Sequence, residues 1–260
     1  MTEAKDYTIA AVDRAILVLE ALAARPNQGL TELAKSLGMT KSLIFRILFT
    51  LEERGFVSRD AERSEYALGY RIGVLGECLG KDGGLLFAAR PVMDWLRDVT
   101  SENVNLVIRD GSESYVLATR PGRHSMRLFA QAGRFGPLHA GGSSQLLLAY
   151  AEPAVIEEVL AKPLETFTPY TITDPEKLSQ TLERIRASGY NIVANDLDEG
   201  AFSVAAPITA ADGTVTASIS VAGAVMRLDE ERRAANLEAA LEAGRRISDK
   251  LAVGGLLKVD

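Results

Sequence analysis

The chain has 260 residues, of which 47% are hydrophobic and 25% charged, and this balance is typical of a globular protein with one large core or two smaller ones. The net charge of −6 excludes nucleic-acid binding through bulk positive charge, and the single cysteine, Cys78, excludes a disulfide framework or a cysteine-based metal site. The polar N-terminus and the absence of a long apolar run predict a cytoplasmic protein with no membrane segment.

The first predicted helix covers residues 12–24. It has an apolar stripe at helical spacing and no strong breaker. We expect it to precede a small DNA-binding motif and to supply contacts between two copies of the chain. The stripe consists of Val12, Ile16, Leu19 and Leu22.

A helix-turn-helix pattern follows this first helix. We expect Thr31 to cap the exposed amides of its first helix, and Gly38 to supply the permissive backbone of the turn. The buried face of that helix consists of Leu33, Ala34 and Leu37.

The second helix of the motif is predicted to begin after a cap at Thr40. One face repeats Leu43, Ile44, Ile47, Leu48 and Leu51, which would anchor the helix to a small core. Its N-terminal turns would then enter the major groove of double-stranded DNA. Leu43 and Phe45 have no hydrogen-bonding groups for base edges, so they would influence base preference only through apolar contact. The DNA-contacting candidates on this helix are Thr40, Lys41, Ser42, Leu43, Phe45 and Arg46.

A two-stranded wing is predicted directly after that helix. Gly55 ends the helix, one strand starts at residue 56, and residues 65–68 return as the second strand. Arg59 and Arg63 would lie in the polar turn and meet phosphate or the minor groove. Amphipathic helix pairs also occur in all-α domains that never bind DNA, but the hairpin favours a winged helix-turn-helix.

The remaining sequence predicts a second domain. Residues after the wing favour helix but contain several glycines and Pro91, and the pair at residues 83–84 predicts a boundary. Strands and helices then alternate, which predicts a sheet with helices on its faces. The expected strands are 103–110, 114–120, 202–210 and 214–222, and the expected helices are 142–150, 154–161, 174–188 and 229–251.

A ligand site is predicted where the strand region leads into the helix at residue 142. Gly141 and Gly142 allow close approach of a ligand, and with Ser143 they offer amides at a helix N-terminus, which attract a carboxylate. An ordinary glycine turn with serine caps is the alternative. Aromatic rings that could line the pocket, or simply fill the core, are Phe129, Phe135 and Phe202.

Several segments carry a family resemblance over nearly the whole chain. AVDRAILVLEALA, GLTELAKSLGMTKSLIFRILFTLEERGFVSRD and YALGYRIGVLG resemble the N-terminal half of an IclR-type transcriptional regulator, and FGPLHAGGSSQLLLAY, SGYNIVANDLDEG and FSVAAPITAADGTVTASISVAG resemble its C-terminal half. The resemblance implies an α+β fold with a winged helix-turn-helix over residues 1–76, a linker helix over 77–86 and a GAF/PAS-like effector-binding domain over 87–260. It also implies a homodimer, or a dimer of dimers, on a palindromic operator.

The resemblance also carries pocket positions over to this chain. Ser203 stands where the family often has a cysteine, Ser220 and Ala222 stand where a serine pair is common, and Val193 stands at an acidic position. Ser220 and Ala222 are two apart on a strand and so share one face. These departures predict a larger or more apolar effector, such as an aromatic acid or its derivative.

An enzyme is not expected. His124 and His139 have no metal-ligand partner at a suggestive spacing, and the acidic cluster of Asp196, Asp198 and Glu199 is better interpreted as a solvated turn. We expect no cofactor and no metal. The sequence thus predicts a ligand-responsive regulator, most simply a repressor of a catabolic operon. The alternative is a metabolite-binding or protein-interaction adaptor whose helix-turn-helix serves dimerisation only.

Overall fold

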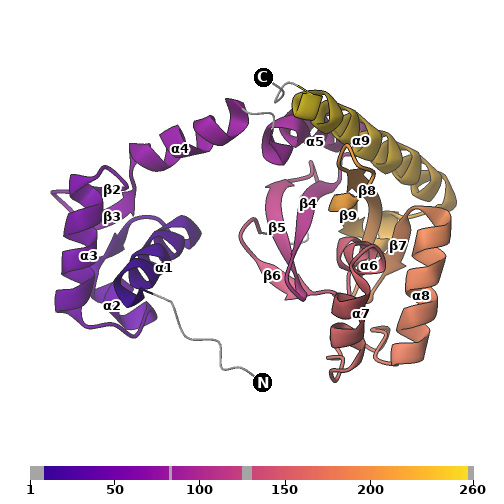
Figure 1. Cartoon of the computed structure of the whole chain (residues 1–260), viewed down its shortest axis with the longest axis horizontal. Helices are drawn as coiled ribbons and strands as arrows, with labels where there is room; N and C mark the ends of the chain where they lie inside the picture. The colour runs from indigo at the N-terminus through magenta and orange to yellow at the C-terminus, as the bar shows by residue number, and fades with distance from the viewer. Residues whose placement is uncertain (1–8, 82–83, 125–130, 257–260) are drawn as a thin grey trace. The chain divides into compact units, whose positions relative to one another are not determined.

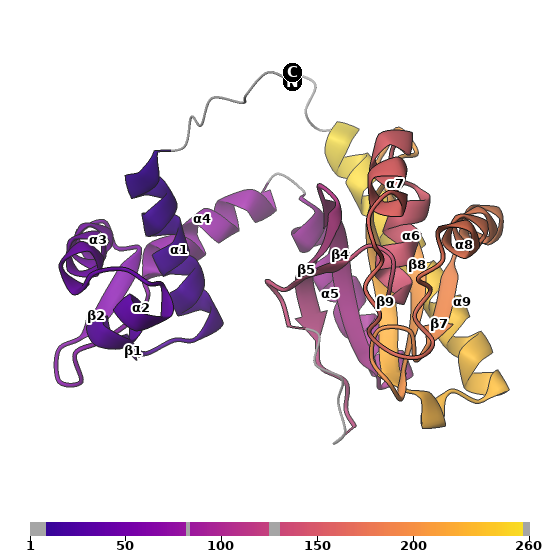
Figure 2. The ribbon, with the colours of Figure 1, turned by 90° about the horizontal axis from the view of Figure 1, so that it is seen from below.

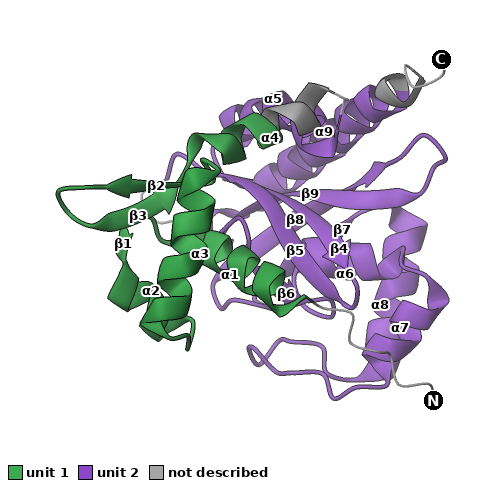
Figure 3. Ribbon diagram, turned by 60° about the vertical axis from the view of Figure 1, so that its left-hand side comes forward, with its two compact units in different colours: residues 1–81 green, residues 82–260 purple. Residues whose placement is uncertain are grey.

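The protein consists of two compact units, Met1–Lys81 and Asp82–Asp260 (Figures 1 and 3). Its structure is a computed structural model that describes residues 9–81, 84–124 and 131–256. Helices and an antiparallel sheet together make the α+β fold that the sequence predicts. Within the described ranges, no helix is both long enough and apolar enough to cross a membrane.

The N-terminal unit is a winged helix-turn-helix, as expected. A small core lies under its helices and contains Val18, Leu33, Ile44 and Leu48. The unit has one strand that the sequence did not predict, β1, which pairs with β3 and widens the wing to a three-stranded antiparallel sheet of order β1-β3-β2. Its elements are α1 (Ala10–Ala24), β1 (Gln28–Gly29), α2 (Leu30–Ser36), α3 (Lys41–Glu53), β2 (Val57–Asp60), β3 (Glu65–Leu68) and α4 (Tyr70–Lys81).

The helix caps follow the local sequence with one exception. The Thr40 hydroxyl accepts the Leu43 N–H at 3.4 Å, and Gly38 has a φ of +62°, which suits the turn. The cap predicted at Thr31 is wrong: α2 begins at Leu30 and no side chain caps it. Because Gly29 belongs to β1, the chain passes directly from a strand into the helix and leaves no position for a side-chain cap.

The apolar stripe of α1 is divided between core and surface. Leu22 is buried and Leu19 packs against the core, but Val12 is 53% exposed and Ile16 is 49% exposed. Only the C-terminal half of α1 therefore packs against the small core, and among the residues that the structure describes the apolar side chains of its first turns stay largely exposed.

The helix expected over residues 77–86 overlaps the end of an observed helix that begins earlier. It is α4, which begins directly after the wing and ends at Lys81, and residues 82–83 lie outside the described part of the chain. The next helix, α5 (Leu85–Thr100), continues through Pro91. Pro91 is on the exposed side of α5, where water can reach the carbonyl that loses its N–H partner, so the proline does not end the helix.

The C-terminal unit is built on a six-stranded antiparallel sheet of order β6-β5-β4-β9-β8-β7. The sequence predicted four of these strands as two hairpins, and β9 joins the hairpins by pairing with both β4 and β8. After α5, the elements are β4 (Asn103–Asp110), β5 (Glu113–Arg120), β6 (Phe135–Pro137), α6 (Gly142–Ala149), α7 (Pro153–Leu160), α8 (Pro175–Ser188), β7 (Asn191–Ala194), β8 (Ala201–Thr209), β9 (Val215–Ala224), a 3₁₀ turn (Val225–Arg227) and α9 (Glu230–Leu256).

Helices pack on both faces of the sheet (Figure 2). Each face carries an apolar core. Along β9, Ile219 and Val221 face α5 and α9, and the alternate residues Ser218 and Ser220 face α6. A continuous apolar core fills the α5–α9 side. On the α6 side the core is interrupted by polar residues, and the interruption is a cavity.

Candidate functional site

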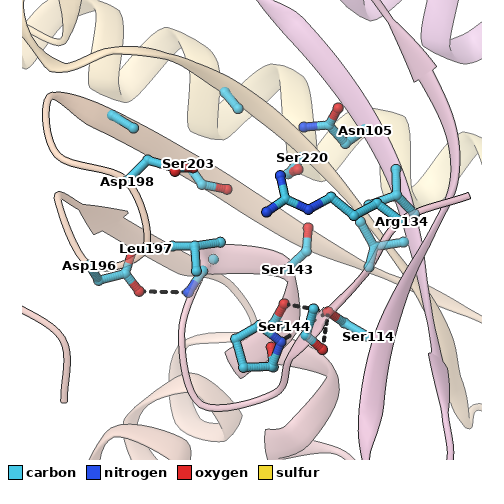
Figure 4. A pocket seen from close by; sticks show the side chains of 18 of the residues that line it. Asn105, Ser114, Arg134, Ser143, Ser144, Asp196, Leu197, Asp198, Ser203 and Ser220 are labelled. Atoms are coloured by element: carbon cyan, nitrogen blue, oxygen red, sulfur yellow. Dashed lines mark hydrogen bonds between the residues drawn. The ribbon is translucent and has the colours of Figure 1, made fainter. Parts of the chain in front are cut away.

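The cavity has a volume of about 480 Å³ and lies between the sheet and the N-terminus of α6 (Figure 4). Strands β4, β8 and β9 supply its wall, β5 and β6 one side, and the loop between β7 and β8 the other. The volume falls within the range usual for small-molecule sites. Its polar lining includes Asn105, Ser114, Arg134, Ser143, Ser144, Asp196, Ser203 and Ser220.

The α6 N-terminus is closely fitted to the sheet. Gly141 precedes the helix with a φ of +90°, and no side chain caps the first turn. A Cβ built on Gly142 would lie 2.6 Å from the Ser203 Oγ, so only glycine fits there. The Ser218 hydroxyl on β9 donates a hydrogen bond to the Ser143 hydroxyl, with 3.2 Å between the two oxygens. The exposed amides of this turn are therefore held beside serine hydroxyls, which suits a carboxylate or carbonyl group.

Asp196 fixes the loop that leads into α6. Its Oδ2 accepts the Gly141 N–H at 2.7 Å and the Gln145 Nε2–H at 3.4 Å. Burial raises the pKa of the Asp196 carboxyl, although the Gly141 amide opposes that shift. We interpreted Asp196 as part of a solvated turn, and this is wrong for Asp196 itself, because the residue is buried and binds the neighbouring loop.

Six of the predicted effector residues line the cavity together: Gly141, Gly142, Ser143, Ser203, Ser220 and Ala222. Val193 does not line the cavity. It lies on β7, the edge strand of the sheet, and pairs there with Ser203 of β8. Phe129 lies outside the described residues. Phe135 borders the cavity and packs against the Tyr115 ring, with 4.8 Å between centroids. Phe202 is only 2% exposed and belongs to the α5–α9 core, so its ring is a core side chain.

Asn105 and Arg134 are among the cavity residues that the sequence did not identify. An asparagine inside the apolar run of β4 was the available signal for Asn105, because a buried amide needs a partner. Arg134 follows residues that the structure does not describe, and no periodicity marks it. His139 is buried, and its Nε2 lies 2.8 Å from the Glu165 carbonyl oxygen, in accordance with the structural role expected for it.

The exposed face of α3 carries most of the predicted DNA-contacting side chains. Lys41, Ser42, Phe45 and Arg46 are exposed. Leu43 is half-buried and packs against the core, in accordance with its predicted place on the anchoring face, so only part of its side chain reaches the surface. The same face also carries Phe49, which was not predicted there; it is 57% exposed, and its ring centroid lies 6.5 Å from that of Phe45.

The wing differs in one respect from its prediction. Strand β2 continues to Asp60, so Arg59 lies on the strand, where its guanidinium is 5.6 Å from the Tyr66 ring centroid. Arg63 does lie in the turn, where the Asp60 Oδ1 accepts the Glu62 and Arg63 N–H groups and holds its shape. Only Arg63 is therefore placed at the tip.

A winged helix-turn-helix in one chain with a domain that encloses a polar cavity is the architecture of a ligand-responsive transcriptional regulator. Comparison with known families agrees. The model for the bacterial transcriptional regulator IclR C-terminal domain matches residues 81–249, and the model for the IclR helix-turn-helix domain matches residues 11–61. The chain belongs to the IclR family of transcriptional regulators. Members of this family bind DNA and small-molecule effectors and are not enzymes.

Relatives of known name cover nearly the whole chain. The HTH-type transcriptional regulator BhcR of Paracoccus denitrificans is 35% identical over 92% of this chain and 86% of its own length. KipR of Bacillus subtilis is 32% identical over 92% of this chain and 96% of its own length.

Solved structures agree with the fold. An IclR regulator from Alicyclobacillus acidocaldarius has a TM-score of 0.83 and 26% identity over 94% of this chain and all of its own. An IclR homologue from Microbacterium hydrocarbonoxydans, solved in complex with 4-hydroxybenzoate, has a TM-score of 0.82 and 26% identity over 94% of this chain and 99% of its own.

Proposed function

We propose that this regulator represses catabolic genes and is released from its operator when a small organic acid enters the cavity. The observation that carries the proposal is the α6 N-terminus, whose uncapped amides lie beside the Ser203 hydroxyl and open into the cavity. Such a turn favours negative charge. The similar regulator that was solved with 4-hydroxybenzoate supports an acid as the ligand.

DNA binding is proposed to use the exposed face of α3 together with the wing. Lys41 and Arg46 have no carboxylate within 4 Å among the described residues, so both cations are available to phosphates or base edges. Because the first 80 residues carry about as many acidic as basic side chains, local placement has to supply the attraction. We expect few phosphate contacts per copy.

Self-association is proposed to supply the remaining contacts. The exposed apolar side chains on α1 and α4 include Val12, Ile16, Val74 and Leu75, and Ile9 directly before α1 is exposed as well. A second copy that covered them would remove them from water and place two α3 helices on a palindromic site. Sedimentation of the purified protein would measure the resulting assembly.

Fluorescence anisotropy of the full chain with its own upstream DNA tests the proposal. We expect selective binding relative to a scrambled duplex, a steep loss of affinity with salt, and release by an organic acid. Ser220→Val, which replaces a cavity hydroxyl with two methyl groups, should abolish release and leave DNA binding of the unliganded protein unchanged. Binding that is unselective at every salt concentration would instead favour an adaptor whose helix-turn-helix serves dimerisation.

A further inference from the structure

A second group of polar side chains lines the cavity, supplied by the sheet and by the segment that leads into β6. Arg134, directly before β6, extends its guanidinium into the cavity toward Ser143 and Ser220 (Figure 4). In the same unit, Arg120 pairs with Asp94, and Arg227 pairs with Glu102. Arg134 has no such pair: within the described residues, no carboxylate oxygen comes within 4 Å of its guanidinium.

A buried amide lies beside this arginine. Asn105 on β4 is 7% exposed, and its Oδ1 is buried without any hydrogen-bond partner. Asn105 is opposite Ser220 in the β4–β9 pairing, and both residues line the cavity. A buried amide that lacks a partner costs free energy, and a ligand that reached it would recover part of that cost. We call Arg134, Asn105 and Ser220 the Arg134 cluster.

Acidic residues near the cavity do not neutralise the cluster. The Asp196 carboxylate is engaged by the Gly141 N–H on the opposite side. Glu113, Glu165 and Asp198 line the cavity but are exposed, so water and salt screen their charge. Arg134 is exposed as well, but its guanidinium is directed into the cavity, where it lies on the path of an anionic group that enters.

We propose that Arg134 is an effector-binding residue whose guanidinium pairs with a carboxylate of the effector, while Asn105 and Ser220 bind the same end of the molecule. The effector is then an organic acid with a second acceptor group, such as another carboxylate or a keto or hydroxyl oxygen, directed to the α6 amides. This inference rests on the proposed function and refines it. It also changes the sequence-based expectation of an apolar ligand, because the cluster adds polar contacts that the resemblance did not include.

Matched acids and amides test the inference on the full-length protein. Calorimetry would compare succinate, pyruvate and 4-hydroxybenzoate with their neutral amides. The wild type should bind at least one acid roughly 10-fold or more tightly than its amide. Arg134→Gln should weaken the acid roughly 10- to 100-fold, leave the amide nearly unchanged and so remove the preference. Arg134→Lys should lie between, since it keeps the charge but loses the planar fork.

Arg184→Gln is the control, because Arg184 is an exposed arginine of α8 away from the cavity. The Arg184→Gln variant should bind the acid with the same affinity as the wild type. Acid binding by a folded Arg134→Gln variant at wild-type strength would overturn the role of Arg134 and leave the acid-responsive function standing. Binding of amides but of no acid, or of neither at millimolar concentration, would overturn both. If Arg134→Gln fails to fold, the lysine variant provides the test. Acid affinity of Arg134→Lys equal to that of the wild type would then contradict the pairing of the Arg134 guanidinium with the carboxylate.

Discussion

Two asparagines of β4 show how one residue type can serve the fold or the ligand. The Asn103 Oδ1 accepts the Gly122 N–H at 2.7 Å and ties β4 to the segment that follows β5. Asn105, two positions along the same strand, has a buried Oδ1 without a partner. The first amide stabilises the unliganded protein, and the second destabilises it.

Asn105→Leu should therefore raise the melting temperature of the unliganded protein. Leucine has the branched shape of asparagine and no unsatisfied acceptor, and the cavity beside residue 105 accommodates its larger side chain. A gain of about 1 kcal/mol corresponds to roughly 2–4 °C for a unit of this size. Asn103→Leu, the control, should lower the melting temperature, because it leaves the Gly122 amide without an acceptor. Thermal unfolding followed by circular dichroism measures both. A lower melting temperature for Asn105→Leu would show that the Asn105 amide has a stabilising partner.

Arg46→Ala should weaken operator binding by about 1–3 kcal/mol if the guanidinium binds a base edge. The loss should then fall on the specific duplex and spare the scrambled one, whereas a phosphate contact would weaken both equally. Fluorescence anisotropy with the two duplexes distinguishes these outcomes, and Arg184→Ala in the other unit is the control. An isotherm identical to the wild type on both duplexes would remove Arg46 from the interface.

At the scale of elements, the loop between β7 and β8 holds the α6 N-terminus through one carboxylate. Because burial raises the pKa of Asp196, the folded state binds a proton more readily than the unfolded state does. The stability of the protein should therefore fall as the pH rises from about 4 through that raised pKa. This loss of stability would persist at higher pH, because the Asp196 carboxylate remains ionised and buried there.

Asp196→Asn should remove this pH dependence. An asparagine oxygen can still accept the Gly141 N–H but cannot ionise. The difference in melting temperature between variant and wild type, measured between pH 4 and pH 8, should move in favour of the variant as the pH rises. A difference that stays constant over this range would contradict a raised pKa.

Element boundaries were predictable from the sequence where a local signal sets them. The Asp174 side chain accepts the Glu176 and Lys177 N–H groups at the start of α8, and Gly189 ends that helix with a φ of +78°. The burial of an apolar side chain is not local. Val12 and Leu22 share the spacing of one stripe, yet only Leu22 meets the core, because the core is too small to cover the whole of α1.

The cavity was predictable only in part, for the same physical reason. The glycine pair Gly141–Gly142 by itself predicts a place where another group can approach the backbone closely. The Arg134 cluster exists only because β9 pairs with β4 and β6 borders β5, so three distant segments meet. No local sequence pattern predicts either of these strand pairings.

At the scale of the whole molecule, the effector and the operator should affect each other equally. If an acid lowers the affinity for DNA by a given factor, DNA must lower the affinity for the acid by the same factor, typically about 5- to 150-fold. Calorimetric titration of the acid into free protein and into the protein–DNA complex measures the second factor. Unequal factors would show that a further event, such as a change in self-association, accompanies binding.

The pairing of β4 with β9 has a consequence for how the chain is made. The ribosome synthesises the winged helix first. Strand β4 can pair with β9 only later, because β9 lies near the end of the chain. A chain that stopped before β9 would carry a whole DNA-binding unit beside an open strand edge, with Val104 and Leu106 left uncovered. Translation therefore completes the unit that binds DNA before the unit that contains the cavity, so an unfinished chain would keep the winged helix-turn-helix and lack the site that binds the effector.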